Sequence, residues 1–209
     1  LAKASGFPID KILLPIGNDV LHVDNEKNTT TGGTGQDVSQ KWYKNFTLAR
    51  KLYIHIIERL LSVADVHIVH NMSNHDYVSG YMLADAVWCW FHKSKNITWD
   101  IDASHRKYFK YGKSLIGTTH GDGGKMDSLP LSMSMEAKDY WASCDYYYWY
   151  LKHLHHKQKY KFSAGQDMQG VSIEYLRSPS GTDSWHSKNQ YANNIKAVEG
   201  FIHSKKLGQ

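Results

Sequence analysis

Short apolar runs separated by polar turns divide this sequence into alternating elements. Runs that are continuous or alternate with polar residues predict strands at 11–16, 66–69, 146–151 and 171–176, and a hairpin over 108–119 that turns near Gly112. Apolar residues at three- and four-residue spacing predict helices at 39–64, 81–91, 130–141 and 194–205. Strands that alternate with helices and are followed by further strands predict an α/β fold, with 1–209 as a single domain.

Potential metal ligands follow four of the predicted strands directly. They are Asp19, the triplet Asn74-His75-Asp76, His120, and the pair His153 and His155. Side chains at strand ends are held by a rigid sheet and can converge on one point. Two divalent ions about 4 Å apart can neutralise phosphoryl oxygens and activate a water molecule. An uncoordinated His can then protonate the leaving group. This ligand set is therefore the one that metal-dependent hydrolysis of a phosphate ester requires.

Composition adds modest constraints. The formal net charge is +5 at pH 7, with 13 His in addition, which fits a phosphate-bearing substrate without requiring one. The two cysteines do not form a Cys-x-x-Cys pair, which favours a reducing compartment. We find neither a signal peptide nor an apolar run long enough to cross a membrane, so we expect a cytoplasmic protein without a membrane partner.

Four motifs, in this order along the chain, resemble those of calcineurin-like metallophosphoesterases. Gly17-Asn18-Asp19 resembles the Gly-Asp motif with one residue inserted, Asn74-His75-Asp76 the Gly-Asn-His-Asp/Glu motif, Thr119-His120-Gly121 the isolated His motif, and His153-Leu154-His155 the closing Gly-His-x-His motif. The resemblance covers nearly the whole chain and is to phage and bacterial members, including the segment around Trp185. It implies a layered sandwich of mixed β-sheets flanked by helices. It also implies a phosphodiesterase or phosphomonoesterase of a bacterial or phage-infected cell, with nucleic acid among the candidate substrates.

The resemblance also implies roles for individual residues. Asp19 would bridge two divalent ions such as Mn, Fe or Zn. Asn74, His120 and His153 would complete one metal site, and His155 would serve the other. His75 would be the catalytic residue that donates to the leaving group. His156 and His186 are expected to lie near the site and to contact substrate.

Several positions depart from the family pattern. Ser73 and Lys152 replace glycines before the second and fourth motifs. His22 stands where many members have an Asp that orients the catalytic His, which leaves Asp24 as a substitute partner. The family's first motif, Asp-x-His, has no counterpart before Ile12. We therefore expect the chain to lack the N-terminal strand with this motif.

Two alternatives to the enzyme remain open. In the first, the absence of Asp-x-His is genuine, and the chain is a degenerate, non-catalytic module that keeps the fold and binds a metal or a partner. In the second, the chain is a structural zinc protein unrelated to the family. The wide separation of the ligands along the sequence argues against this second alternative, because the ligands of compact zinc modules cluster tightly. The oligomeric state, the natural substrate and the identity of the metal do not follow from the sequence.

Overall fold

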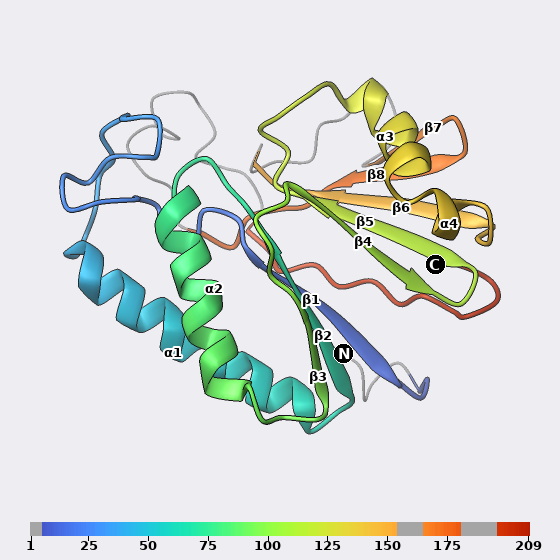
Figure 1. Cartoon of the computed structure of the whole chain (residues 1–209), viewed down its shortest axis with the longest axis horizontal. Coiled ribbons are helices and arrows are strands. Elements are labelled where there is room, and N and C mark those ends of the chain that lie inside the picture. The colour runs from blue at the N-terminus through green and yellow to red at the C-terminus, as the bar shows by residue number, and fades with distance from the viewer. Residues whose placement is uncertain (1–5, 154–164, 181–195) are drawn as a thin grey trace. The chain divides into compact units, whose positions relative to one another are not determined.

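The computed structural model describes residues 6–153, 165–180 and 196–209 (Figure 1). The chain divides into two compact units, unit 1 (Leu1–His105) and unit 2 (Arg106–Gln209). Each unit has its own β-sheet and its own hydrophobic core. The predicted α/β class is thereby confirmed as two sheets flanked by helices. The assignment of 1–209 to one domain stays a prediction.

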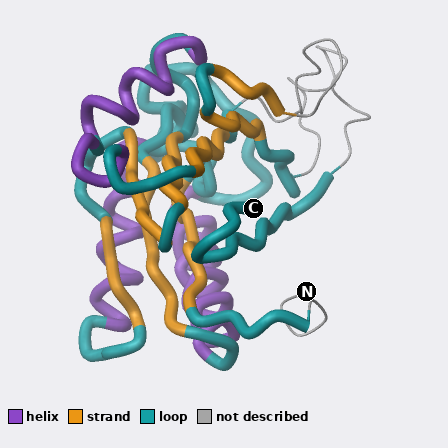
Figure 2. Tube along the Cα trace, turned by 90° about the vertical axis from the view of Figure 1, so that its right-hand side faces the viewer, coloured by secondary structure: helices purple, strands orange, loops and turns teal. Residues whose placement is uncertain are grey.

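Unit 1 is built on a three-stranded parallel sheet. The strand order is β1 (Lys11–Gly17), β2 (Asp65–Asn71) and β3 (Ile97–Asp100). Parallel neighbours require crossover connections, and here these contain α1 (Trp42–Leu61) and α2 (Tyr77–Phe91). Right-handed crossovers that advance in one direction along a sheet place both helices on the same face, as Figures 1 and 2 show. The core between sheet and helices includes the fully buried Ile57, Ile68 and Val87.

Unit 2 contains a five-stranded mixed sheet. In spatial order the strands are β4 (Arg106–Tyr111), β5 (Ser114–Thr119), β6 (Tyr146–Leu151), β8 (Val171–Tyr175) and β7 (Gly165–Met168). The connection from β5 to β6 contains η1 (Met126–Ser128), α3 (Leu129–Glu136) and α4 (Lys138–Trp141). Trp149 is fully buried in this core, and its indole N–H donates to the Leu129 carbonyl at 3.1 Å. A buried indole N–H needs such an acceptor.

Strand register places the candidate ligands of each unit at one sheet edge. In unit 1, Gly17 is paired with Asn71, so the segments after β1 and β2 leave the sheet side by side. In unit 2, Thr119 is paired with Leu151 in the parallel β5–β6 ladder, so the segments after these strands also leave together. The register therefore brings the segments that carry candidate ligands side by side within each unit, and their convergence on one metal site stays a prediction.

The structure corrects the sequence prediction in three places. Two short strands, β3 and β7, were not predicted. The predicted terminal helix at 194–205 is wrong over 196–205, which contains no helix. There the Phe201 ring stacks on Tyr150 with centroids 4.6 Å apart, and His203 Nε2 lies 2.9 Å from the Tyr150 hydroxyl. These contacts with a strand about fifty residues away hold the segment in a non-helical path.

A spanning helix needs about 20 predominantly apolar residues. Among the described residues, no helix combines that length with sufficient apolar character to span a membrane. α1 has 20 residues but is amphipathic, with Lys and Arg side chains along its length.

Candidate metal and catalytic site

The loop after β1 carries backbone strain at three non-glycine residues. Asn18, Asp19 and His22 have positive φ angles of 61°, 65° and 67°. This left-handed conformation is costly for residues with a Cβ atom, although Asn, Asp and His adopt it more often than most. Strain of this kind persists where surrounding contacts over-determine the backbone, and it clusters at functional sites. Contacts from the segment after β2 supply that constraint in unit 1.

The buried carboxylate of Asp76 holds the strained loop in place. Its Oδ2 accepts the Leu21 N–H at 2.8 Å, and its Oδ1 accepts the Ser73 hydroxyl at 2.6 Å. The Ser73 hydroxyl oxygen in turn accepts the Asp19 N–H at 3.0 Å. Ser73 therefore makes two hydrogen bonds that a glycine could not make. The sequence motif contains Asp76, but no local pattern indicated that it and Ser73 together fix the Asp19 backbone.

His75 contacts the same loop through both its backbone and its side chain. Its N–H donates to Asp19 Oδ1 at 3.1 Å, and its Nδ1 lies 3.2 Å from the His22 carbonyl oxygen. Because a carbonyl oxygen can only accept, Nδ1 carries the hydrogen, and Nε2 is the position that can exchange a proton. The orienting partner of His75 is therefore the His22 backbone.

Asp24, the expected alternative partner, has a different role. Its carboxylate accepts the Val78 and Ser79 N–H groups at the N-terminus of α2, at 3.1 Å and 2.7 Å, and the Thr31 hydroxyl at 2.8 Å. Partial burial would raise the pKa of Asp24, but hydrogen bonds from Ser79, Thr31 and Val78 outweigh burial and lower this pKa. The group that orients the His75 ring is therefore the His22 carbonyl, and not Asp24 as suggested from the sequence.

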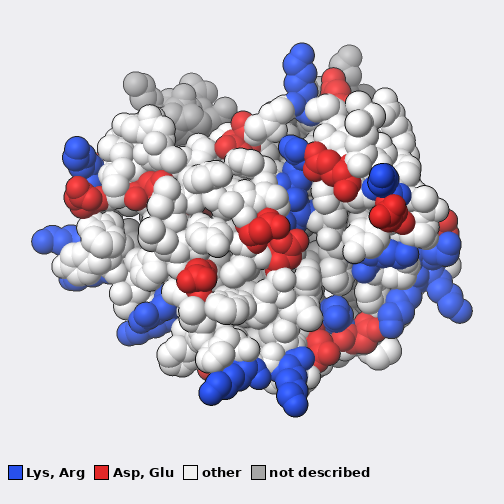
Figure 3. All heavy atoms as spheres, in the orientation of Figure 1, with Lys and Arg blue, Asp and Glu red and all other residues white. Residues whose placement is uncertain are grey.

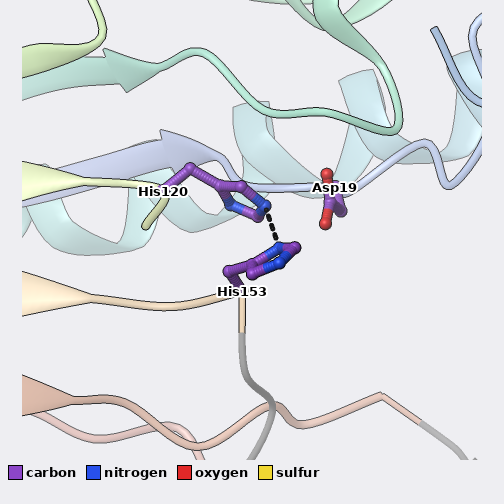
Figure 4. A group of neighbouring side chains, drawn as sticks. All are labelled: Asp19, His120 and His153. Carbon is purple, nitrogen blue, oxygen red and sulfur yellow. Dashed lines mark hydrogen bonds between the residues drawn. The ribbon is translucent and has the colours of Figure 1, made fainter. Parts of the chain in front are cut away.

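His120 and His153 form a close pair in unit 2. His120 is buried and His153 is half-buried. His153 Nδ1 lies 3.1 Å from His120 Nε2, with the ring centroids 5.0 Å apart (Figure 4). Two nitrogens that bind one tetrahedral ion at typical zinc–imidazole distances lie about 3.3 Å from each other. The spacing of this pair therefore fits two ligands of one ion.

The turn that carries His153 is fixed by the backbone of its neighbour. The Lys152 N–H donates to the His120 carbonyl at 3.0 Å, which ties the segments after β5 and β6 together. The residue with positive φ in this turn is His153, at 52°, and not Lys152. The turn therefore requires no left-handed backbone at the position of Lys152. Burial lowers the pKa of the Lys152 ammonium.

The remaining predicted site residues are placed as follows. Asn74 is half-buried in the turn between Ser73 and His75. Asp19, which follows β1 in unit 1, is another predicted ligand and is drawn in Figure 4. His155, His156 and His186, which were predicted as ligand or substrate contacts, lie outside the described residues.

Comparison with known proteins adds no assignment to this geometry. No protein-family model matches the chain. No curated protein and no solved structure matches it either. The four sequence motifs and the geometry within each unit are therefore the basis on which a function can be argued.

Proposed function

We propose that the chain is a calcineurin-like metallophosphoesterase domain, a metal-dependent hydrolase of phosphodiesters or phosphomonoesters. The observation that carries the proposal is the His120–His153 pair, whose nitrogens are spaced like two ligands of one ion. The motif order along the chain and the strained, tightly held loop at Asp19 support it.

The proposed ligands are those that the resemblance implies. They are Asp19, Asn74, His120, His153 and His155, which would hold divalent ions such as Mn, Fe or Zn, two in the complete domain. Asp19, His120 and His153 each offer one oxygen or nitrogen ligand atom. Their assignment to a shared site rests on this chemistry and on the motif order. Bound ions of this kind neutralise phosphoryl oxygens and supply an activated water.

The proposed contribution of the protein to Asp19 is to orient it. The Ser73 hydroxyl fixes its backbone N–H, and the His75 N–H fixes its Oδ1. A carboxylate that is held before the ligand arrives loses less conformational entropy on binding than a free one. Unit 1 therefore presents Asp19 in one orientation, as a bridging ligand requires.

His75 is the proposed general acid. The His22 carbonyl holds its Nδ1, which leaves Nε2 to donate to the leaving oxygen of the ester when the ring is protonated. In the neutral ring Nε2 has no hydrogen to give, so the charged form is the one that acts. This assignment makes a testable distinction between catalysis and metal binding.

We expect the His75→Asn variant to lose turnover while it keeps its metal content. A positioned general acid contributes about 10²- to 10⁴-fold, so turnover of an alkyl phosphodiester with Mn²⁺ should fall by at least about a hundredfold. The loss should be smaller for a nitrophenyl diester, whose leaving group needs little protonation. His55→Asn, an exposed His on α1, is the matched control and should retain full turnover. Equal turnover of wild type and His75→Asn on the alkyl diester would remove the assigned role.

The same experiment decides between the enzyme and the degenerate module. The module keeps metal binding at the His120–His153 pair but has no catalytic use for His75. A chain that binds Mn²⁺ and hydrolyses neither diester is the result expected of the module. Hydrolysis of the nitrophenyl diester that depends on Mn²⁺ is the result expected of the enzyme.

A further inference from the structure

α2 presents an apolar stripe on the side that faces away from its buried core. The helix has 15 residues, and Asp85 is its single charged residue. The α2 stripe consists of exposed residues at three- and four-residue spacing, namely Val78, Tyr81, Met82, Asp85, Trp88 and Cys89. Val78 and Met82 are 51% and 57% exposed. A helix that is apolar on its outer as well as its inner face has the composition of a buried helix. The exposed side of α2 is therefore suited to contact with a partner.

α1 lies beside α2 on the same face of the sheet and presents a stripe of different composition. Leu48 and Leu52 are each 51% exposed and lie one turn apart on the outer side of α1. The exposed charged residues on this side are Lys44, Lys51, Glu58 and Arg59. In Figure 3 the area over α2 is mostly white, whereas blue side chains lie along α1. The α1 stripe therefore combines an apolar contact surface with an excess of positive charge.

The two helices end at a similar level of the sheet. α1 ends at Leu61 before β2 begins at Asp65, and α2 ends at Phe91 before β3 begins at Ile97. In the parallel β2–β3 ladder, Val66 is paired with Ile97, so these two strands begin side by side. Both helices rise by the same amount per residue. Residues about 30 positions apart, as Leu61 and Phe91 are, therefore lie at about the same level along the helix pair.

The two stripes complement each other when two copies of the chain pack face to face. A two-fold axis along the bisector of α1 and α2 places α2 of one copy parallel to α1 of the other and directly over it. Residues at the same level of the two helices then face each other across the contact. Leu48 and Leu52 of one copy meet Val78 and Met82 of the second copy. The apolar parts of both stripes are thereby buried against each other.

Charge favours this pairing over other occupants of the α2 stripe. Asp85 of one copy lies between the levels of Lys51 and Arg59 of the other, so the single carboxylate of the α2 stripe faces two cations. Packing of α2 on α2 would instead bring two Asp85 carboxylates together near the middle of the stripe. A lipid surface would bury Asp85 without a counter-ion. The α1 stripe of a second copy is therefore the partner that matches both the apolar residues and the charge.

The size of the combined surface sets the expected affinity. The 20 residues of α1 extend about 30 Å and the 15 residues of α2 about 22 Å. Two packed helices are about 20 Å wide, so each copy contributes roughly 500 Å². A total of about 1,000 Å² is at the lower end for a specific interface.

We propose that two copies of this chain form a symmetric, reversible dimer in which α2 of each copy packs along α1 of the other. The association involves none of the proposed metal ligands and does not depend on the phosphoesterase function.

Sedimentation equilibrium of the intact chain tests the association. The wild type should dimerise with a Kd of about 1–100 μM, as the modest area implies. Met82→Asn and Leu52→Asn should each weaken the dimer by at least about tenfold. Asp85→Lys should do the same, because it places a third cation between Lys51 and Arg59. Leu131→Asn, at a leucine that is 58% exposed on α3, is the matched control and should dimerise as the wild type does. Circular dichroism checks that each variant is folded.

The native Cys89 provides a test of the pairing itself. Cys89 is exposed and lies about level with Arg59 of the second copy. Under mild oxidation, Arg59→Cys should therefore form a disulfide between copies, which requires Cα atoms within about 7 Å. A non-reducing gel should show this covalent dimer. The wild type and the double variant Arg59→Cys/Cys89→Ser should stay uncrosslinked, because the proposed pairing does not place like helices over each other.

Three results overturn the proposal. The first is a wild type that stays monomeric up to about 500 μM. The second is a dimer whose affinity is unchanged in both Met82→Asn and Asp85→Lys, which places the contact on another surface. The third is a wild type that crosslinks through Cys89 alone while Arg59→Cys adds no further crosslink, which indicates packing of α2 on α2. A dimer that is weakened by the stripe variants and crosslinked only when Arg59→Cys and Cys89 are both present supports the proposed pairing.

Discussion

Gly17, the last residue of β1, lies close to the end of β2 and contacts α1. Its φ angle is 88°, and a Cβ atom there would lie 2.5 Å from the Asn71 carbonyl oxygen and 2.9 Å from His70 Cδ2. Its N–H donates to the Tyr53 hydroxyl at 3.0 Å. The turn that leads to Asp19 therefore requires glycine for two reasons, the positive φ angle and the close approach of Asn71 and His70 at the end of β2.

Gly17→Ala should destabilise the protein and disturb the Asp19 loop. A left-handed alanine costs about 1–2 kcal/mol, and relief of the contact with the Asn71 carbonyl adds to it, so the free energy of unfolding should fall by at least about 2 kcal/mol. Chemical denaturation measures this change. Gly35→Ala is the control, because a Cβ at Gly35 meets nothing within 4 Å. A Gly17→Ala variant as stable as Gly35→Ala would contradict the described turn.

At the scale of elements, the N-terminus of α2 is capped by a residue distant in sequence. Asp76, at the N-cap position, makes no side-chain capping hydrogen bond and instead accepts the Leu21 N–H and the Ser73 hydroxyl. Asp24 replaces it, accepting the Val78 and Ser79 N–H groups. The helix start is therefore coupled to the loop that follows Asp19.

The lowered pKa of Asp24 gives this coupling a pH dependence. Because the folded-state pKa lies below the ordinary value of 3.8, the carboxylate stabilises the fold fully above about pH 4. That contribution disappears as pH falls from there through the folded-state pKa. The stability difference between wild type and Asp24→Ala should therefore be constant from about pH 5 to 7 and shrink below about pH 4. Asp127→Ala, at an exposed Asp in η1, should show no comparable change. A difference that persists undiminished to pH 2 would contradict this role.

At the scale of the whole molecule, the sequence predicted most elements but only part of the site. Runs such as those at β1 and β6 were recognisable because their apolar and aromatic residues follow one another almost without interruption. β3 has only four residues and depends on pairing with β2, so no local pattern identifies it. The predicted helix at 194–205 failed because its aromatic residues pack against Tyr150, a long-range contact.

For the candidate site, too, local sequence patterns identified some residues, whereas the roles of others depend on long-range contacts. The candidate residues Asp19, His75, His120 and His153 were recognisable because each lies within four residues after the end of a strand. The roles of Ser73 and the His22 carbonyl were not, because they depend on hydrogen bonds between segments more than fifty residues apart. Ligand types can be read from motifs, whereas the contacts that orient ligands depend on tertiary structure.

Metal binding by single-ligand variants tests the central claim most directly. Calorimetric titration of the wild type with Mn²⁺ or Zn²⁺ should show binding, and loss of a ligand should weaken it by at least about tenfold. We predict this loss for His153→Ala, His120→Ala and Asp19→Ala. His92→Ala, at an exposed His after α2, should bind as the wild type does, and circular dichroism should show that all variants are folded. Wild-type affinity in both His120→Ala and His153→Ala would contradict the proposed metal centre.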